Sequence, residues 1–276
     1  MSYSRFVAIG DSQTEGMCDG DDVTGYRGWA DRLAERLSRD DPDFRYANLA
    51  VRGRRTRQIR DQQLYPALAM EPDLIAAPLG MNDVLASTGL AEVRRDLDFI
   101  YRELARTSAT VLISTYPNMA RTVPIARRIE SRLLAVNQMM REFSDSYGFV
   151  LVDLVSAPVL LDPRSWSPDR LHASPFGHDR FAAGAAYALN LADSEPDWGA
   201  PLPPRPELTA AQIIAREALW ARTFFIPWII RRMRGRSLGD GLSPKRPELA
   251  PVRPPTGGYD NGPAPLREPG RDEPSR

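Results

Sequence analysis

The feature that most constrains this chain is a short apolar run near its start that ends at a serine. Residues 6–9 (Phe-Val-Ala-Ile) lead directly into Gly10, Asp11 and Ser12. A short apolar run bounded by glycine is typical of a buried strand in a mainly parallel sheet. Because ligands bind to such sheets where the strands end, the sequence predicts that the Ser12 hydroxyl lies at a binding site.

A serine at such a site needs a base, and the chain offers few. A hydroxyl becomes a nucleophile when an imidazole takes its proton, and the imidazole needs a carboxylate to fix its tautomer. The two histidines, His172 and His178, lie in one short stretch, and Asp169 precedes His172 by three positions. We predict that Asp169 and His172 serve Ser12. His178 is expected to be structural, and Asp153, at the end of a later strand, is the alternative orienting acid.

Strands and helices alternate along the first 195 residues. Apolar runs predict further strands at residues 44–50, 73–79, 110–117 and 149–155. Helical spacing predicts helices at 27–39, from after Gly53 to about 70, from 83 or 88 to 107, and at 124–147 and 175–192. This alternation predicts a three-layer α/β/α sandwich with a five-stranded, mainly parallel sheet. We expect the flavodoxin-like order 2-1-3-4-5, because it brings the ends of the first three strands to one switch point.

Two more residues stand at strand ends where a negative oxygen could be bound. Gly53 follows the second strand, where glycine supplies a permissive backbone angle or turns its N–H toward Ser12. Asn82 follows the third strand, and its NH₂ group can donate to an oxyanion or cap a helix. The adjacent acids Asp11 and Asp83 are expected to hold their turns through backbone hydrogen bonds.

Four separated blocks make the sequence resemble the SGNH (GDSL-like) hydrolase family of serine esterases, lipases and acylhydrolases. The blocks are residues 10–16 (Gly-Asp-Ser-Gln-Thr-Glu-Gly), 48–53 (Asn-Leu-Ala-Val-Arg-Gly), 80–83 (Gly-Met-Asn-Asp) and 169–172 (Asp-Arg-Leu-His). They occur in this order, and the resemblance extends to about residue 192. Gln13 stands where the family usually has leucine, a variation that leaves the nucleophile in place.

The resemblance implies a role for each matched residue. Ser12 would be the nucleophile, His172 the base and then the acid, and Asp169 its orienting carboxylate. The backbone N–H groups of Ser12 and Gly53 and the side chain of Asn82 would form the oxyanion hole. The reaction would be acyl transfer through an acyl-Ser12 intermediate on a small-molecule ester, with no metal and no organic cofactor. An acyltransferase or thioesterase would use the same site, and a non-catalytic binding protein is the weaker alternative because no catalytic residue is missing.

Composition excludes some classes of function. The net charge is zero and the arginines are scattered among acids, so nucleic-acid binding is not expected. Cys18 is the only cysteine, which leaves no intrachain disulfide, and we expect it to be a small packing residue. The start of the chain lacks the pattern of a signal peptide, so a cytoplasmic location and a small intracellular ester or thioester substrate are expected. Specificity is expected to depend on loops after the strands, which contain Met17, Tyr26, Met81, Asn118 and Trp166.

The last third of the chain differs in composition from residues 1–195, the predicted hydrolase domain. Residues 196–206 form a predicted proline-rich linker and 235–276 a predicted disordered tail. Between them, residues 207–234 predict an amphipathic helical segment with a kink at Pro227. Its apolar face over 209–234 packs on the domain or on a second copy, or lies peripherally on an anionic membrane. These alternatives stay open.

Overall fold

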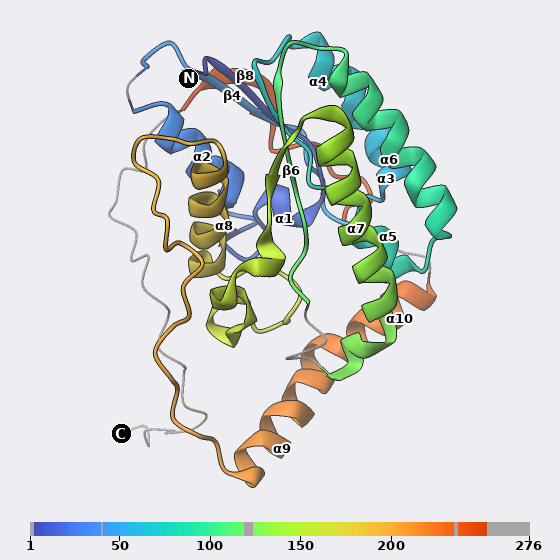
Figure 1. Ribbon diagram of the computed structural model, residues 1–276. Coiled ribbons are helices and arrows are strands. Elements are labelled where there is room, and N and C mark those ends of the chain that lie inside the picture. Colours follow the sequence, from blue (N-terminus) through green and yellow to red (C-terminus); the bar gives the residue numbers. More distant parts are fainter. Residues whose placement is uncertain (1–2, 40, 119–123, 235–236, 253–276) are drawn as a thin grey trace.

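A sheet between two layers of helices organises the molecule (Figure 1). The computed structural model describes residues 3–39, 41–118, 124–234 and 237–252. Within these residues the main sheet has six strands, of which five are parallel: β1 (Arg5–Ala8), β4 (Arg45–Asn48), β5 (Leu74–Ala76), β6 (Thr110–Ser114) and β7 (Val150–Val152). Their spatial order, β7-β6-β5-β1-β4, is the predicted 2-1-3-4-5 order. The predicted α/β/α sandwich is confirmed.

Different helices cover the two faces of the sheet (Figure 1). One face is covered by α2 (Trp29–Leu37) and α8 (Pro175–Ala188). The other is covered by α3 (Thr56–Ile59), the π-helical turn η1 (Arg60–Leu64), α4 (Tyr65–Ala69), α6 (Leu90–Ala105) and α7 (Glu130–Tyr147). Phe6 packs in the first core and Val7 in the second. Successive side chains alternate across a strand, so a strand covered on both faces needs apolar residues on both, as the three buried residues Phe6, Val7 and Ala8 of β1 provide.

The remaining elements of the domain are short. They are α1 (Ser12–Glu15), the hairpin strands β2 (Gly20–Asp21) and β3 (Gly25–Tyr26), α5 (Met81–Ala86), and the 3₁₀ turns η3 (Pro124–Ile129), η4 (Leu154–Ser156), η5 (Pro158–Leu161) and η6 (Pro163–Ser165). α1 and α5 begin directly after β1 and β5, and the three turns η4 to η6 connect β7 to the loop that carries His172.

The sixth strand, β8 (Arg246–Pro251), pairs antiparallel with β4 at the edge of the sheet. The prediction of disorder from residue 235 onward was wrong for this strand. Composition measures how much apolar surface a segment can bury. β8 is instead held by backbone pairing with an open sheet edge, a position that tolerates proline. The predicted disorder of residues 253–276 concerns residues outside the described part of the chain.

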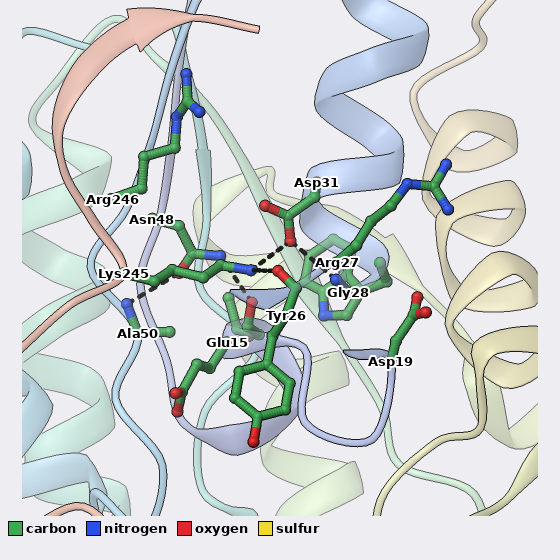
Figure 2. Close-up of polar contacts among 12 residues, drawn as sticks. Glu15, Asp19, Tyr26, Arg27, Gly28, Asp31, Asn48, Ala50, Lys245 and Arg246 are labelled. Carbon is green, nitrogen blue, oxygen red and sulfur yellow. Dashed lines mark hydrogen bonds and ion pairs between the residues drawn. The ribbon is translucent and has the colours of Figure 1, made fainter. Parts of the chain in front are cut away.

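Two basic side chains connect β8 and the residue before it to the domain, and Figure 2 shows the contacts of the first, Lys245. The Nζ of Lys245 lies 2.6 Å from Asp31 Oδ2 and 2.8 Å from the carbonyl oxygen of Tyr26. The guanidinium of Arg246 donates to the carbonyl oxygen of Tyr46 at 2.8 Å and lies 5.3 Å from the centre of its ring. Lys245 is the only lysine of the chain, and its ion pair joins the C-terminal segment to the start of α2.

The proline-rich linker, residues 196–206, packs on the domain. Trp198 is buried against Gly184 of α8, where an added Cβ would lie 2.9 Å from the indole ring. The carbonyl oxygen of Gly199 accepts a hydrogen bond from the Val159 N–H at 3.1 Å. The linker therefore directs the chain from α8 along the outside of the domain to the next helices.

Residues 207–234 form α9 (Ala210–Trp220), the π-helical turn η7 (Ala221–Phe225) and α10 (Ile226–Met233). The interruption expected at Pro227 takes the form of this wider turn just before it, because proline lacks the N–H of a regular helix and its ring needs room. In Figure 1 these helices run across the lower end of the molecule, beneath α7. No helix among the described residues is both long enough and apolar enough to cross a membrane. Docking of this segment on a membrane or a second copy stays a prediction.

Candidate active site

The turn between β1 and α1 places Ser12. Asp11 caps α1 by accepting a hydrogen bond from the Gln13 N–H at 3.2 Å, and Ser12 is the first residue of the helix. Gly10 has φ 154°, and an added Cβ would lie 2.7 Å from the Thr14 hydroxyl oxygen, so a side chain has no room here. The resulting sharp turn brings Ser12 to the end of the strand.

A buried glutamine stabilises this turn through hydrogen bonds, and the sequence did not identify it. Gln63 lies on the π-helical turn η1, and its amide makes two hydrogen bonds with the backbone of Gly10. Its Oε1 accepts from the Gly10 N–H at 2.8 Å, and its Nε2 donates to the Gly10 carbonyl oxygen at 2.9 Å. A polar residue within a helical pattern was the available signal, and it is weak without the tertiary contact.

Ser12, His172 and Asp169 form a hydrogen-bonded series. The Ser12 Oγ lies 2.9 Å from Nε2 of His172, and Nδ1 of His172 lies 2.6 Å from Oδ2 of Asp169. Ser12 and His172 are buried, with 7% and 5% of their surface exposed. The structure thus brings Ser12 into contact with His172, which lies 160 positions away in the sequence, and His172 into contact with Asp169.

The second oxygen of Asp169 organises the loop. Oδ1 accepts hydrogen bonds from the backbone N–H groups of Leu171 and His172, at 2.9 and 3.0 Å, and from the Ser167 hydroxyl at 2.5 Å. One carboxylate oxygen therefore caps the turn while the other faces the imidazole. Asp153 lies elsewhere, since its Oδ1 accepts from the Thr115 hydroxyl at 2.7 Å and from Arg141 at 3.0 Å.

The opposite charges of Asp169 and His172 shift the pKa values of both side chains. Burial alone would lower the pKa of His172, but the hydrogen bond and negative charge of Asp169 outweigh it, and the Cys18 side chain adds to the same effect. The net result raises the pKa of His172 to about 10. Burial acts to raise the pKa of Asp169, and the hydrogen bond and charge of His172 instead hold it well below its usual range. The ion pair is therefore favoured at neutral pH in the unliganded site.

Gln13 makes hydrogen bonds to the backbone of the loop on both sides of His172. Its Nε2 donates to the Leu171 carbonyl oxygen at 2.9 Å, and its Oε1 accepts from the Ala173 N–H at 3.2 Å. This residue differs from the leucine usual in the resembled family, and leucine could make neither bond.

We expect Gln13→Leu to lower kcat about 10- to 100-fold with little change in KM, because His172 loses its fixed position relative to Ser12. Steady-state kinetics on a soluble p-nitrophenyl ester would measure the two constants. Gln138→Leu, on the exposed face of α7, is the matched control and should leave both constants unchanged. An effect on KM alone would contradict a positioning role.

The side chains of Asn82 and Asp11 are hydrogen-bonded to each other. The Asn82 Nδ2 donates to Asp11 Oδ2 at 2.9 Å and to the carbonyl oxygen of Arg54 at 3.0 Å. Burial raises the pKa of Asp11 to about 6, although the backbone bond from Gln13 acts in the opposite direction. Both hydrogen bonds use the Asn82 NH₂ group, so an oxyanion bound there would have to share these N–H donors with Asp11 and Arg54.

Two acids brace the loop that carries Gly53. Glu15 accepts from the backbone N–H of Arg52 at 2.7 Å and pairs with its guanidinium at 2.6 Å, and both side chains are buried. Asp83 accepts from the N–H and the hydroxyl of Thr56, at 2.8 and 2.7 Å, and so holds the start of α3 rather than its own turn. Gly53 has φ 76°, a left-handed conformation that favours glycine.

Ser12 and His172 lie on the wall of a large cavity of about 890 Å³. Gly53 and Asn82 also line it, and so do Met17, Met81 and Trp166 among the predicted substrate residues. The described lining residues do not include Tyr26 or Asn118, which is a correction to the prediction. The Tyr26 hydroxyl bonds to Asp22 at 3.1 Å, and the Asn118 amide bonds to Glu130 at 2.7 Å. Local sequence placed both on loops but could not give the direction of their side chains.

Cys18 also lies in the site, and the expectation of a simple packing residue was wrong. Its Sγ is 4.0 Å from Asp169 Oδ2, and Cys18, Asp169 and His172 have potential metal ligands within 4.8 Å of one another. Both ring nitrogens of His172 are already bonded, to Ser12 and to Asp169, so an ion here would have to break that series. These three side chains therefore belong to the Ser12 site rather than to a separate metal site.

His178 is fully buried and caps a helix. Its Nδ1 accepts from the Trp29 N–H at the start of α2, at 3.2 Å, and its Nε2 lies 3.0 Å from the carbonyl oxygen of Met17. Burial lowers the pKa of His178 to about 3, so the ring is neutral. The structural role predicted for this histidine is consistent with these contacts.

We expect His178→Ala to lower the free energy of unfolding by about 3 kcal/mol, from two lost buried hydrogen bonds and a cavity. Urea denaturation at pH 7 would measure it, with Tyr187→Ala on the exposed face of the same helix as a near-neutral control. Because the unfolded chain binds the His178 proton more tightly, wild-type stability should fall as the pH drops below about 6.5. The alanine variant should lack this part of the pH dependence, and an equal dependence in both proteins would contradict the assignment.

An α/β/α sandwich with serine, histidine and aspartate in hydrogen-bonded series at its strand ends is the arrangement typical of serine-type hydrolases. The family is more particular. The chain belongs to the GDSL-like lipase/acylhydrolase family, whose model matches residues 8–180. The protein is accordingly an ester-hydrolysing enzyme.

Solved structures share the fold at low sequence identity. LAE5, an alpha/beta hydrolase enzyme from the metagenome of Lake Arreo in Spain, is 22% identical with a TM-score of 0.59, and the match covers 70% of this chain and 98% of that one. Axe2, an acetylxylan esterase from Geobacillus stearothermophilus, is 19% identical with a TM-score of 0.59 over 71% and 98%. EstA, a psychrotrophic esterase from Pseudoalteromonas sp., is 13% identical with a TM-score of 0.53 over 68% and 97%. No curated protein matches the chain significantly in sequence.

Proposed function

We propose that this enzyme hydrolyses carboxylic esters through an acyl-Ser12 intermediate, with His172 as base and Asp169 as orienting carboxylate. The observation that carries the proposal is the series Ser12 Oγ, His172 Nε2 and Nδ1, Asp169 Oδ2, with spacings of 2.9 and 2.6 Å, on the wall of a cavity. These are the spacings that proton transfer requires. Family membership supports the reaction class.

The steps follow from these positions. The Ser12 oxygen attacks the ester carbonyl carbon while Nε2 of His172 takes its proton. The negative charge on the carbonyl oxygen is stabilised by the backbone N–H groups of Ser12 and Gly53 and by the Asn82 amide. The C–O bond to the leaving alcohol then breaks, and the imidazolium returns the proton to the alkoxide. Water attacks acyl-Ser12 by the same route and releases the acid. Asp169 stabilises the imidazolium in both halves.

Acyl transfer to another acceptor would share the first half of this cycle. An alcohol or amine in place of water yields a new ester or amide, and a thioester in place of the ester releases a thiol. Product analysis distinguishes these outcomes, because only hydrolysis releases free acid in an amount equal to the leaving group.

A covalent probe tests the proposal without knowledge of the natural substrate. EstA, which shares the fold, is described as inhibited by monoethylphosphonate. We expect an alkyl fluorophosphonate to modify this protein once, at Ser12, as measured by intact mass and peptide mapping. His172→Ala should slow the labelling by several orders of magnitude, because the hydroxyl then lacks its base. Modification at another residue, or none, would contradict the proposal.

A further inference from the structure

The C-terminal helices form one wall of the cavity that contains Ser12. Large side chains from α9, η7 and α10 line it, and Trp220, Phe224, Trp228 and Ile229 are among them. Other lining residues belong to the hydrolase domain and include Met81 and Leu85 of α5. The family match ends at residue 180, so this wall lies beyond the part of the chain that defines the family.

Hydrogen bonds and an ion pair hold this wall against the loop of residues 169–172, which carries Asp169 and His172. The Trp220 indole N–H donates to the carbonyl oxygen of Asp169 at 3.1 Å. The guanidinium of Arg170 makes two bonds to the Glu217 carboxylate, at 2.7 and 2.9 Å, and lies 4.6 Å from the centre of the Trp220 ring. α9 is thus held against the loop that carries Asp169 and His172.

The segment after α10 is held as well. Gly239 lies so close to the loop before Gly53 that an added Cβ would be 2.0 Å from the carbonyl oxygen of Arg52. Farther along, Lys245 makes its ion pair with Asp31 (Figure 2). Both ends of the helical segment are therefore attached to the domain, and its position over the site is part of the fold.

The apolar residues of this wall face a cavity rather than a packed core. None of the described residues of α9 and α10 is fully buried, although the segment contains two tryptophans and two phenylalanines. Apolar side chains that line a cavity gain less hydrophobic stabilisation than those in a packed core, and an apolar ligand there would remove both its own surface and theirs from water. Arg55, Arg128 and Arg231 also contribute to the lining, but they are exposed and their charged groups can reach solvent.

The size of the cavity points to a long ligand. At about 890 Å³ it lies near the upper end of the roughly 300–1,000 Å³ typical of pockets that enclose a drug-sized molecule. An acetyl group would leave nearly all of this space and its apolar wall in contact with water. A flexible hydrocarbon chain bound to the Ser12 carbonyl would cover this wall and the lining residues of the domain.

We propose that α9 and α10 form an acyl-binding wall and that the substrates are esters or thioesters of medium- to long-chain fatty acids. This inference rests on the proposed function, because it places the acyl group relative to Ser12. It replaces the expectation of a small ester with a chain-length preference set by Phe224 and Trp228.

Kinetics on a p-nitrophenyl series from acetate to dodecanoate, below the concentration at which the esters aggregate, tests the proposal. Wild-type kcat/KM should rise about three- to fourfold for each added methylene until the cavity is filled. Trp228→Ala and Phe224→Ala should each lower the dodecanoate-to-acetate ratio at least about tenfold. Ile230→Ala, on the exposed face of α10, is the matched control and should keep the wild-type ratio. A wild-type preference for acetate, or an unchanged ratio in both pocket variants, would overturn the inference and leave the hydrolase proposal intact.

Binding to the inactive protein separates this inference from the proposed function. In Ser12→Ala, calorimetry with dodecanoate should show saturable binding that weakens at least about tenfold when Trp228→Ala is added. This result would support the acyl site even if no ester were hydrolysed and no phosphonate reacted, which would count against the hydrolase proposal alone. Absence of dodecanoate binding together with an acetate preference would reject the acyl wall.

Discussion

Replacement of Ser12→Ala is expected to lower kcat on a p-nitrophenyl ester by about 10⁵- to 10⁶-fold. The loss is large because the proposed mechanism forms and breaks a covalent bond at the Ser12 Oγ, and without it the cavity walls and oxyanion donors can act only on attack by water. Release of p-nitrophenol, measured with enough protein to detect the residual rate, gives the ratio directly. The variant should also lose all labelling by the fluorophosphonate.

Cys18→Ala is the informative control for this result. Its thiol is the other nucleophile near the acid–base pair, with Sγ 4.0 Å from Asp169 Oδ2. We expect this variant to keep covalent labelling and turnover within about one order of magnitude, because Ser12 and its contact with His172 stay in place. If the cysteine variant lost activity and the serine variant kept it, the nucleophile would be the thiol and the assignment of Ser12 would be wrong.

Asp169→Asn is expected to lower kcat about 10⁴-fold. The reason lies in the three donors at Oδ1, which come from Ser167, Leu171 and His172. They require an acceptor, so the amide oxygen of asparagine takes that position and its NH₂ group faces Nδ1 of His172. The imidazole must then carry its proton on Nε2, where it can no longer accept the proton of Ser12.

The same substitution should move the pH profile. Asp169 raises the pKa of His172 in the wild-type protein to about 10, and only the neutral ring acts as a base, so wild-type kcat/KM should increase as the pH rises above 7. In Asp169→Asn the negative charge is gone, the pKa of His172 falls, and the rising limb of the residual activity should lie at lower pH. If the rising part of the pH profile lay at the same pH in Asp169→Asn as in the wild-type protein, the assignment of the Asp169–His172 ion pair would be wrong.

Asp153→Asn is the matched control for the aspartate. Asp153 was the alternative orienting acid, and in the structure it contacts Thr115 and Arg141. We expect this variant to keep the wild-type pH profile and most of the turnover, because its contacts lie outside the series that ends at Ser12. A loss comparable to that of Asp169→Asn would reverse the two assignments.

Local pattern predicted most of the sheet because its strands are buried on both faces. The runs around Phe6, Ile75, Leu112 and Leu151 each contain at least three consecutive apolar residues, which is typical of buried strands in an alternating chain, whereas the run around Tyr46 is interrupted by polar residues. Strand order followed from the general preference of α/β sheets for one switch point. Asp169 and His172 could be named because they lie three residues apart and because the chain offers few histidines.

Other parts of the site carry no comparable local signal. Gln63 and the Glu15–Arg52 pair are polar residues whose importance depends on partners 53 and 37 positions away. Tyr26 and Met17 belong to the same predicted loop after the first strand, yet Tyr26 lies in β3, where its hydroxyl bonds to Asp22 and Arg52, and it does not line the cavity. Side-chain direction in a loop depends on contacts that periodicity does not report.

The sequence by itself determined the class of fold and the candidates for nucleophile, base and orienting carboxylate, because these depend on residue type and on regular local spacing. The strand order was a choice among topologies, and the structure decided it. Only the tertiary structure decided that β8 completes the sheet edge and that α9 and α10 stand over Ser12. β8 is held by backbone hydrogen bonds, which any residue except proline can donate, and α9 is held by single long-range contacts such as Arg170 to Glu217. Neither kind of interaction requires a periodic pattern of residues, so neither can be predicted from the sequence alone.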